Sequence, residues 1–214
     1  MRKFIVAVPM MLGLVISVRA ASSDGLTPIE PDMAKAFGKR LSEEAAKLEK
    51  PQIKIEADSE KANGVHAPDK MGIIVVPQKD LKESEELAAK FKTEKGASLA
   101  YLFMYHVVPV IDGKAVDVSQ LRSLKIEGDN GKVHTVYVML LAVKQVSDDD
   151  YRLHAYGQGD KPLVDVKFSE GTGPGAEPVA CEIKDPNEAT QQGKLAVTVF
   201  GKYQASFTCA YKAD

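Results

Sequence analysis

The sequence predicts an α+β protein in which an N-terminal helix and a strand-helix-strand unit precede a mainly antiparallel β-meander, built as one sheet or as a sandwich. Three observations support this prediction. Residues 32–48 have the apolar spacing of an amphipathic helix, residues 71–111 place a helical pattern between two apolar runs, and residues 121–211 are short β-prone segments separated by turn signals. We expect residues 32–214 to form a single α+β domain.

The first twenty residues match the pattern of a secretory signal peptide. Arg2 and Lys3 form a basic start, residues 4–18 are apolar, and Val18 and Ala20 place small side chains where a signal peptidase cleaves. A helix of this length spans about 22 Å, less than the roughly 30 Å of a bilayer core. We therefore expect cleavage after Ala20 and a secreted or periplasmic protein, with an uncleaved N-terminal anchor as the alternative. Residues 21–31 are small, polar and proline-containing, as in a flexible linker.

The predicted helix 32–48 has one apolar face and one charged face. The apolar side chains recur every three or four residues: Met33, Phe37, Leu41, Ala45 and Leu48. Pro51 follows and ends the helix. We expect the apolar face to pack against the domain, and the alternative is that helix 32–48 binds a protein partner in the cell envelope.

A strand-helix-strand unit is predicted over residues 71–111. Residues 52–56 alternate as in a strand, 57–70 form a polar loop, and 71–76 are β-branched and uncharged, as in a buried strand. Asp80 stands three residues before Glu83, which resembles a capping box, so a helix is expected from there to about residue 92. Residues 97–111 form one long apolar strand. The order allows a right-handed parallel crossover, with an antiparallel arrangement as the alternative.

The remainder of the chain is typical of a β-meander. Asn130-Gly131 is a strong hairpin signal between strands 121–127 and 132–146, and residues 147–150 form a second turn. Further strands are expected at 162–168, 179–184, 195–200 and 203–211.

Composition excludes several classes of protein. The chain has 28 basic and 30 acidic residues, and the two signs are interspersed, which argues against nucleic acid or an anionic membrane surface as a partner. No apolar run after the signal peptide is long enough for a stable membrane span. The sequence predicts no cofactor and no metal site.

Two cysteines, Cys181 and Cys209, are too few for a disulfide scaffold or a cysteine-based zinc site. In a simple meander their strands are two strand spacings apart, about 10 Å, which is beyond the roughly 7 Å that a disulfide spans. A sandwich that places the two strands face to face would allow a bond. One disulfide and two buried thiols therefore both stay open.

The hairpin signals also place two of the four histidines. A two-residue turn at Asn130-Gly131 pairs His134 with Glu127, and the turn at 147–150 pairs His154 with Val143. On this register His134 and His154 lie on opposite faces of the sheet and share no metal. A single β-bulge would reverse the result. His106 lies in a run that is apolar on both sides, which indicates a buried neutral histidine.

His66 and Asp69 are the weak catalytic candidates, because they lie with Lys70 in a loop braced by Pro68. The structural alternative is that Asp69 only forms a turn. No Gly-x-Ser-x-Gly, His-Glu-x-x-His or Ser-x-x-Lys motif is present, and the glycine-rich residues 171–178 lack the lysine of a phosphate loop. We expect an exported non-enzymatic protein, binding or structural, with an exported hydrolase or metal-dependent enzyme using His66 and Asp69 as the alternative.

Overall fold

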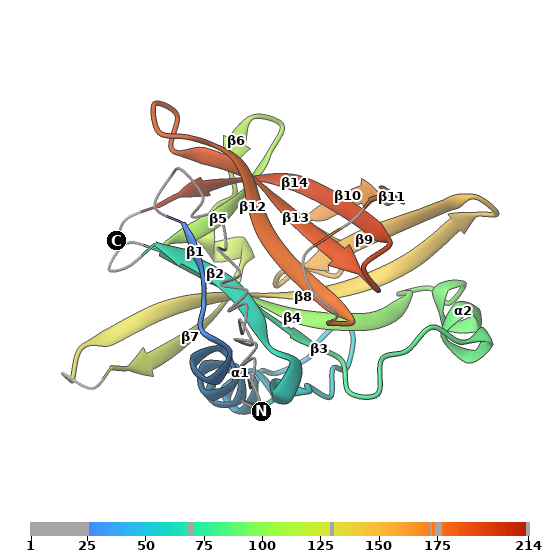
Figure 1. Cartoon of the computed structure of the whole chain (residues 1–214), viewed down its shortest axis with the longest axis horizontal. Coiled ribbons are helices and arrows are strands. Elements are labelled where there is room, and N and C mark those ends of the chain that lie inside the picture. Colours follow the sequence, from blue (N-terminus) through green and yellow to red (C-terminus); the bar gives the residue numbers. More distant parts are fainter. Residues whose placement is uncertain (1–25, 68–70, 129–130, 172, 174–176, 213–214) are drawn as a thin grey trace, which may run out of the picture.

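The computed structural model describes residues 26–67, 71–128, 131–171, 173 and 177–212. Within them an eight-stranded and a six-stranded sheet lie face to face, and helix α1 covers the other face of the larger sheet (Figure 1). Every pairing between named strands is antiparallel, which confirms the α+β class with a mainly antiparallel sheet. The predicted signal peptide lies outside the described residues.

Both sheets are built from segments far apart in the chain. The larger sheet contains β1 (Thr27–Pro28), β2 (Asn63–Ala67), β3 (Met71–Pro77), β4 (Ala97–Tyr105), β7 (Arg122–Glu127), β8 (Val133–Ser147), β9 (Asp150–Tyr156) and β10 (Val164–Lys167). The smaller sheet contains β5 (Val107–Ile111), β6 (Lys114–Ala115), β11 (Ser169–Glu170), β12 (Val179–Asn187), β13 (Gln192–Val199) and β14 (Tyr203–Tyr211). In the described residues the α-helices are α1 (Pro31–Ala45) and α2 (Glu85–Phe91).

The predicted strand 97–111 is two strands in different sheets. β4 ends at Tyr105, His106 adopts a left-handed conformation with φ of 54°, and β5 begins at Val107 in the smaller sheet. The apolar pattern did not reveal this break, because both strands are buried on both sides. At His106 the chain first crosses from the larger to the smaller sheet. His106 lies between two strands and is half-buried, so the expectation of a buried histidine in mid-strand was wrong.

The two strands of the predicted strand-helix-strand unit pair in antiparallel orientation. β3 and β4 are neighbours, with Ile74 opposite Phe103, so α2 lies in a long connection and not in a parallel crossover. The helix begins later than predicted, since Ser84 is its N-cap and accepts a hydrogen bond from the Leu87 backbone N–H at 3.2 Å. Asp80 instead has φ of 56° and belongs to the preceding turn.

Helix α1 buries Leu41 and Ala45 as predicted, but its buried face is rotated away from Met33 and Phe37. Its buried residues are mostly small: Ala34, Gly38, Leu41, Ser42 and Ala45. A Cβ on Gly38 would lie 2.6 Å from the Cβ of Ala62, so the missing side chain lets the helix approach the sheet closely. Met33 and Phe37 are turned outward and are each 47% exposed. Close packing, and not the bulk of the apolar side chains, thus sets the rotation of α1.

Residues 26–57 differ from the expected linker and strand. Thr27–Pro28 pair with β2 as β1, and Ile29 is buried, so the end of the predicted linker 21–31 belongs to the fold. Residues 52–56 form no strand, although Ile53 and Ile55 are buried as the alternation predicted. Arg122 holds this segment by donating to the carbonyl oxygens of Glu49, Lys50 and Gly157 and to the amide oxygen of Gln52.

Two apolar cores result from this arrangement. One fills the space between the sheets and includes Ile73, Met139, Leu195 and Phe207, while the other lies between the larger sheet and α1. The predicted meander is therefore a sandwich with a helix on one outer face. The space between the sheets is the part of the molecule that leads to the candidate site.

Candidate functional site

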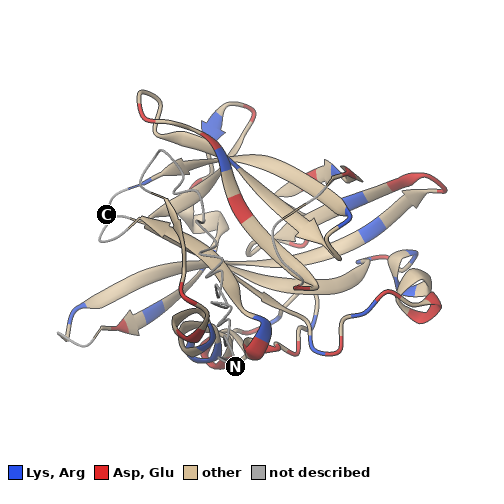
Figure 2. Ribbon diagram, viewed as in Figure 1, with Lys and Arg blue, Asp and Glu red and all other residues tan. Residues whose placement is uncertain are grey.

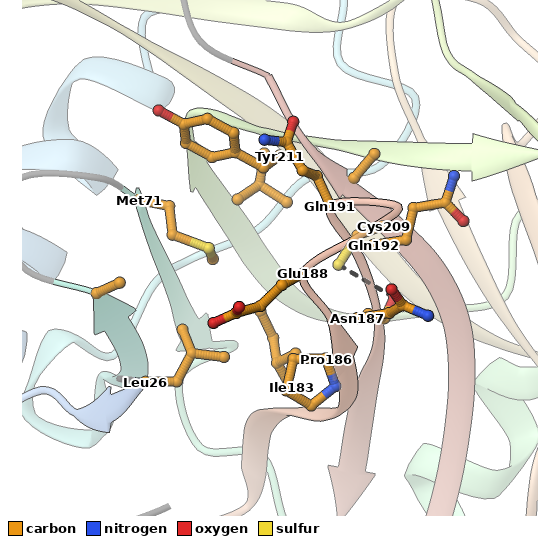
Figure 3. A pocket seen from close by; sticks show the side chains of 14 residues that line it. Leu26, Met71, Ile183, Pro186, Asn187, Glu188, Gln191, Gln192, Cys209 and Tyr211 are labelled. Atoms are coloured by element: carbon orange, nitrogen blue, oxygen red, sulfur yellow. Dashed lines mark hydrogen bonds between the residues drawn. The ribbon is translucent and has the colours of Figure 1, made fainter. Parts of the chain in front are cut away.

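A groove of about 700 Å³ lies where the core between the two sheets reaches the surface. The larger sheet supplies one wall and the smaller sheet supplies the opposite wall and a projecting hairpin (Figure 3). The lining residues are Leu26, Ala67, Met71, Val107, Ile183, Pro186, Asn187, Glu188, Gln191, Gln192, Gly193, Cys209, Ala210 and Tyr211. The volume is in the range of sites that hold small organic ligands.

The walls are apolar because they continue the inward faces of the strands. Side chains alternate along β12, so Cys181 and Ile183 face the same way as Val179 in the core between the sheets. Tyr211 extends the inward row of β14 in the same manner, and Met71 extends the row of β3 that contains Ile73. The groove is therefore the uncovered end of this core.

The hairpin between β12 and β13 forms the polar rim. The pairing shifts register between Lys184 and Asn187, and Asp185 and Gln191 adopt left-handed conformations with φ of 49° and 53°. The amide oxygen of Asn187 accepts the Thr190 backbone N–H at 3.1 Å, which closes the tip. In Figure 3 the carboxylate of Glu188 projects from this tip into the groove, toward the side with Leu26 and Met71.

His66 does not belong to the groove. It lies on strand β2, and not in the predicted loop, with Gly72 as its partner on β3. Its neighbour Ala67 lines the groove, so by alternation His66 is on the opposite face of the sheet. Asp69 and Lys70 lie outside the described residues. The structure thus places His66 away from the groove.

His134 and His154 lie on the same face of the larger sheet, so the predicted opposite placement was wrong. His134 is opposite Ile126, one position from the predicted register, because Glu127 pairs with Val133. His154 is opposite Ala142, because the β8–β9 pairing is irregular between Gln145 and Ser147. Positions 134 and 142 are about 26 Å apart along β8, so the two histidines still cannot share a metal.

An aromatic cluster surrounds His106 beside the groove. Its ring stacks on Tyr105 at 3.9 Å between centroids and meets the ring of Tyr211 edge-on at 6.1 Å. The Tyr105 hydroxyl is 3.0 Å from Nδ1 of His134. These contacts join the two sheets at the point where the chain crosses between them, and they fix the position of Tyr211 in the groove wall.

Both cysteines are free and buried. Their strands β12 and β14 flank β13, with Cys181 opposite Val197 and Cys209 opposite Gly193, so the two thiols are separated across and along the sheet. Burial raises the pKa of the Cys181 thiol to about 12 and that of the Cys209 thiol to about 11. Thiols with such pKa values are poor nucleophiles at neutral pH. The alternative of two buried thiols is therefore the one found in this structure.

Other functional features are few in the described part of the chain. No group of three His, Cys, Asp or Glu side chains there is placed to hold a metal ion. No described helix has the length and apolar character needed to cross a membrane. Figure 2 shows Lys and Arg interspersed with Asp and Glu along the ribbon, as the sequence indicated. Met33 and Phe37 on α1 are exposed, and binding of a protein partner by this helix stays a prediction.

Sequence reasoning did not identify the groove. Its walls come from residues near 26, 70, 107, 185 and 210, and only the order of strands in the two sheets brings them together. The apolar alternation of β12 and β14 was visible, but it did not indicate where the core stays uncovered. Comparison with protein-family models, curated proteins and solved structures finds no match for this chain.

Proposed function

We propose that the protein is an exported, non-enzymatic binding protein that holds a small apolar ligand in the groove between its sheets. The observation that carries this proposal is the groove itself, which is about 700 Å³ in volume and continuous with the apolar core between the sheets. Apolar walls with a few polar groups at the rim are typical of ligand sites. Export is inferred from the N-terminal sequence pattern.

The enzymatic alternative has less support. A hydrolase or metal-dependent enzyme using His66 and Asp69 requires His66 to face a substrate site, and His66 is on the sheet face opposite to the groove. The buried thiols of Cys181 and Cys209 have raised pKa values and are not activated nucleophiles.

Titration with a neutral apolar dye tests the proposal. Nile red fluorescence should rise saturably with the wild-type protein, and Met71→Glu should weaken binding about tenfold, because a charge in the apolar wall must be desolvated. Met33→Glu is the matched control, since Met33 is an exposed methionine on α1 and its substitution should leave binding unchanged.

Circular dichroism spectra of both variants should match that of the wild type, which checks that the fold is intact. Absence of saturable dye binding by the wild-type protein would refute the proposed function. Equal weakening by the two substitutions would show that the dye binds elsewhere.

A further inference from the structure

We propose that the groove selects ligands in which an apolar body carries a protonated amine, with Glu188 as the group that binds the ammonium. This inference rests on the proposed binding function and adds the chemical class of the ligand. It follows from the charges at the groove, the pairing of the other carboxylates on the same hairpin, and the direction of the Glu188 side chain.

Among the residues that the structure describes, the groove has a single sign of charge. Glu188 is the one carboxylate among the described lining residues, and no described Lys or Arg lines the groove. The other polar groups at the rim are neutral: the side-chain amides of Asn187, Gln191 and Gln192 and the hydroxyl of Tyr211. An anionic ligand would therefore face a carboxylate without a compensating cation, whereas a cationic ligand would be attracted to it.

Among the described residues Glu188 also differs from its neighbours on the hairpin in having no ion-pair partner. On the same hairpin Glu182 pairs with Lys184 at 3.0 Å and Asp185 pairs with Lys194 at 3.6 Å. Within the described residues no ion pair includes Glu188, and its carboxylate projects into the groove (Figure 3). A carboxylate that is not already paired with a cation, at the rim of an apolar groove, is available to a cationic ligand.

The two parts of the groove fit an amphiphilic cation. The apolar body would contact Met71, Val107 and Ile183, which lie below the rim, and the ammonium would lie at the hairpin tip. Because Glu188 is solvent-exposed, the attraction is modest: about a two- to fivefold gain in affinity, of the size found for exposed ion pairs. Added salt should reduce this gain and leave the apolar contribution unchanged.

Competition between three ligands of the same chain length tests the inference. The experiment measures how strongly each of three ligands displaces Nile red from the full mature chain at neutral pH: decylamine, decan-1-ol and decanoate. Each ligand is kept below its micelle-forming concentration. The wild-type protein should bind the amine about two to five times more tightly than the alcohol, and the carboxylate most weakly. Glu188→Gln should bind amine and alcohol equally, with its affinity for the alcohol unchanged.

Asp185→Asn is the matched control. It removes a carboxylate from the same hairpin, but one that is paired with Lys194 and does not line the groove, and asparagine suits the left-handed conformation at this position. This variant should keep the wild-type preference for the amine. Equal binding of the three ligands by the wild-type protein, or the same loss in Asp185→Asn as in Glu188→Gln, would overturn the role of Glu188 and leave the binding function standing. Failure of all three ligands and of the dye to bind would refute the binding function as well.

Discussion

His154 on β9 is the most buried of the described histidines. Its Nδ1 is 3.3 Å from the Tyr156 hydroxyl, and its Nε2 is 3.5 Å from a carboxylate oxygen of Asp165. Burial lowers the pKa of His154 below its ordinary value of 6.5; the Asp165 carboxylate opposes this shift, and the cations Lys144 and Arg152 add to it. The imidazole is therefore neutral in the folded protein at neutral pH.

The lowered pKa predicts that acid destabilises the protein through His154. Below about pH 6.5 the unfolded chain binds a proton that the folded protein resists, so the free energy of unfolding falls as the pH drops toward the folded-state pKa. His154→Gln should remove this contribution, so its free energy of unfolding should change less than that of the wild type between about pH 7.5 and 5. Urea titrations at several pH values measure the difference.

His134→Gln serves as the control for this experiment. His134 is half-buried and hydrogen-bonded to Tyr105, so this variant should keep the acid sensitivity that His154 confers. The same pH dependence of unfolding in His154→Gln and the wild type would show that His154 does not cause the acid sensitivity.

The two buried thiols give a prediction about reactivity. Because burial raises the pKa of Cys181 to about 12 and of Cys209 to about 11, we expect Ellman's reagent to react slowly with the native protein. Unfolding in denaturant without a reductant should expose both thiols, with two equivalents of reagent consumed. Finding no free thiol in the unfolded, unreduced protein would show a disulfide and a different order of strands.

At the scale of elements, the side chain of Asn63 joins the two sheets. Its amide nitrogen donates to the Val179 carbonyl at 2.8 Å, and its amide oxygen accepts the Cys181 backbone N–H at 3.2 Å. The side chain of a β2 residue thus takes the place of a neighbouring strand along the edge of β12. It satisfies two backbone groups that point away from β13 and covers this part of the β12 edge.

Asn63→Ala should therefore loosen the edge of β12. Loss of the amide leaves the Val179 carbonyl and the Cys181 N–H without partners, which we expect to lower the free energy of unfolding by about 2 kcal/mol. Hydrogen exchange of the Cys181 amide should become faster. Asn187→Ala removes a comparable side-chain bond at the exposed hairpin tip and should cost less, so equal costs would argue against the bridging role of Asn63.

The positions of most strands along the chain were predictable from the sequence, but which strands pair with one another was not. Period-two alternation located β7, β8, β12, β13 and β14 to within a few residues, because strands with one buried face must alternate. The rotation of α1 was missed, since close packing at Gly38 outweighs the bulk of Met33 and Phe37. The break at His106 was also missed, because a left-handed residue other than glycine leaves no clear trace in a sequence.

At the scale of the whole molecule, the candidate site depends on the topology. The chain crosses between the sheets at His106, and the β12–β13 hairpin projects from the smaller sheet (Figure 1), so Met71, Ile183 and Tyr211 line one opening. A sequence shows which residues are buried in a strand, but not which end of a two-sheet core stays uncovered. His66 and Asp69 are neighbours in sequence, whereas the groove joins residues more than one hundred positions apart.

The most direct test of the binding site is methyl NMR of protein labelled at its methionines. Met71 lies in the groove, Met33 is exposed on α1, and Met139 is in the core between the sheets. On titration with decylamine the Met71 methyl resonance should shift saturably, while the resonances of Met33 and Met139 stay in place. A shift confined to Met33, or no shift of Met71 at a ligand concentration that displaces Nile red, would contradict the assignment of the groove as the binding site.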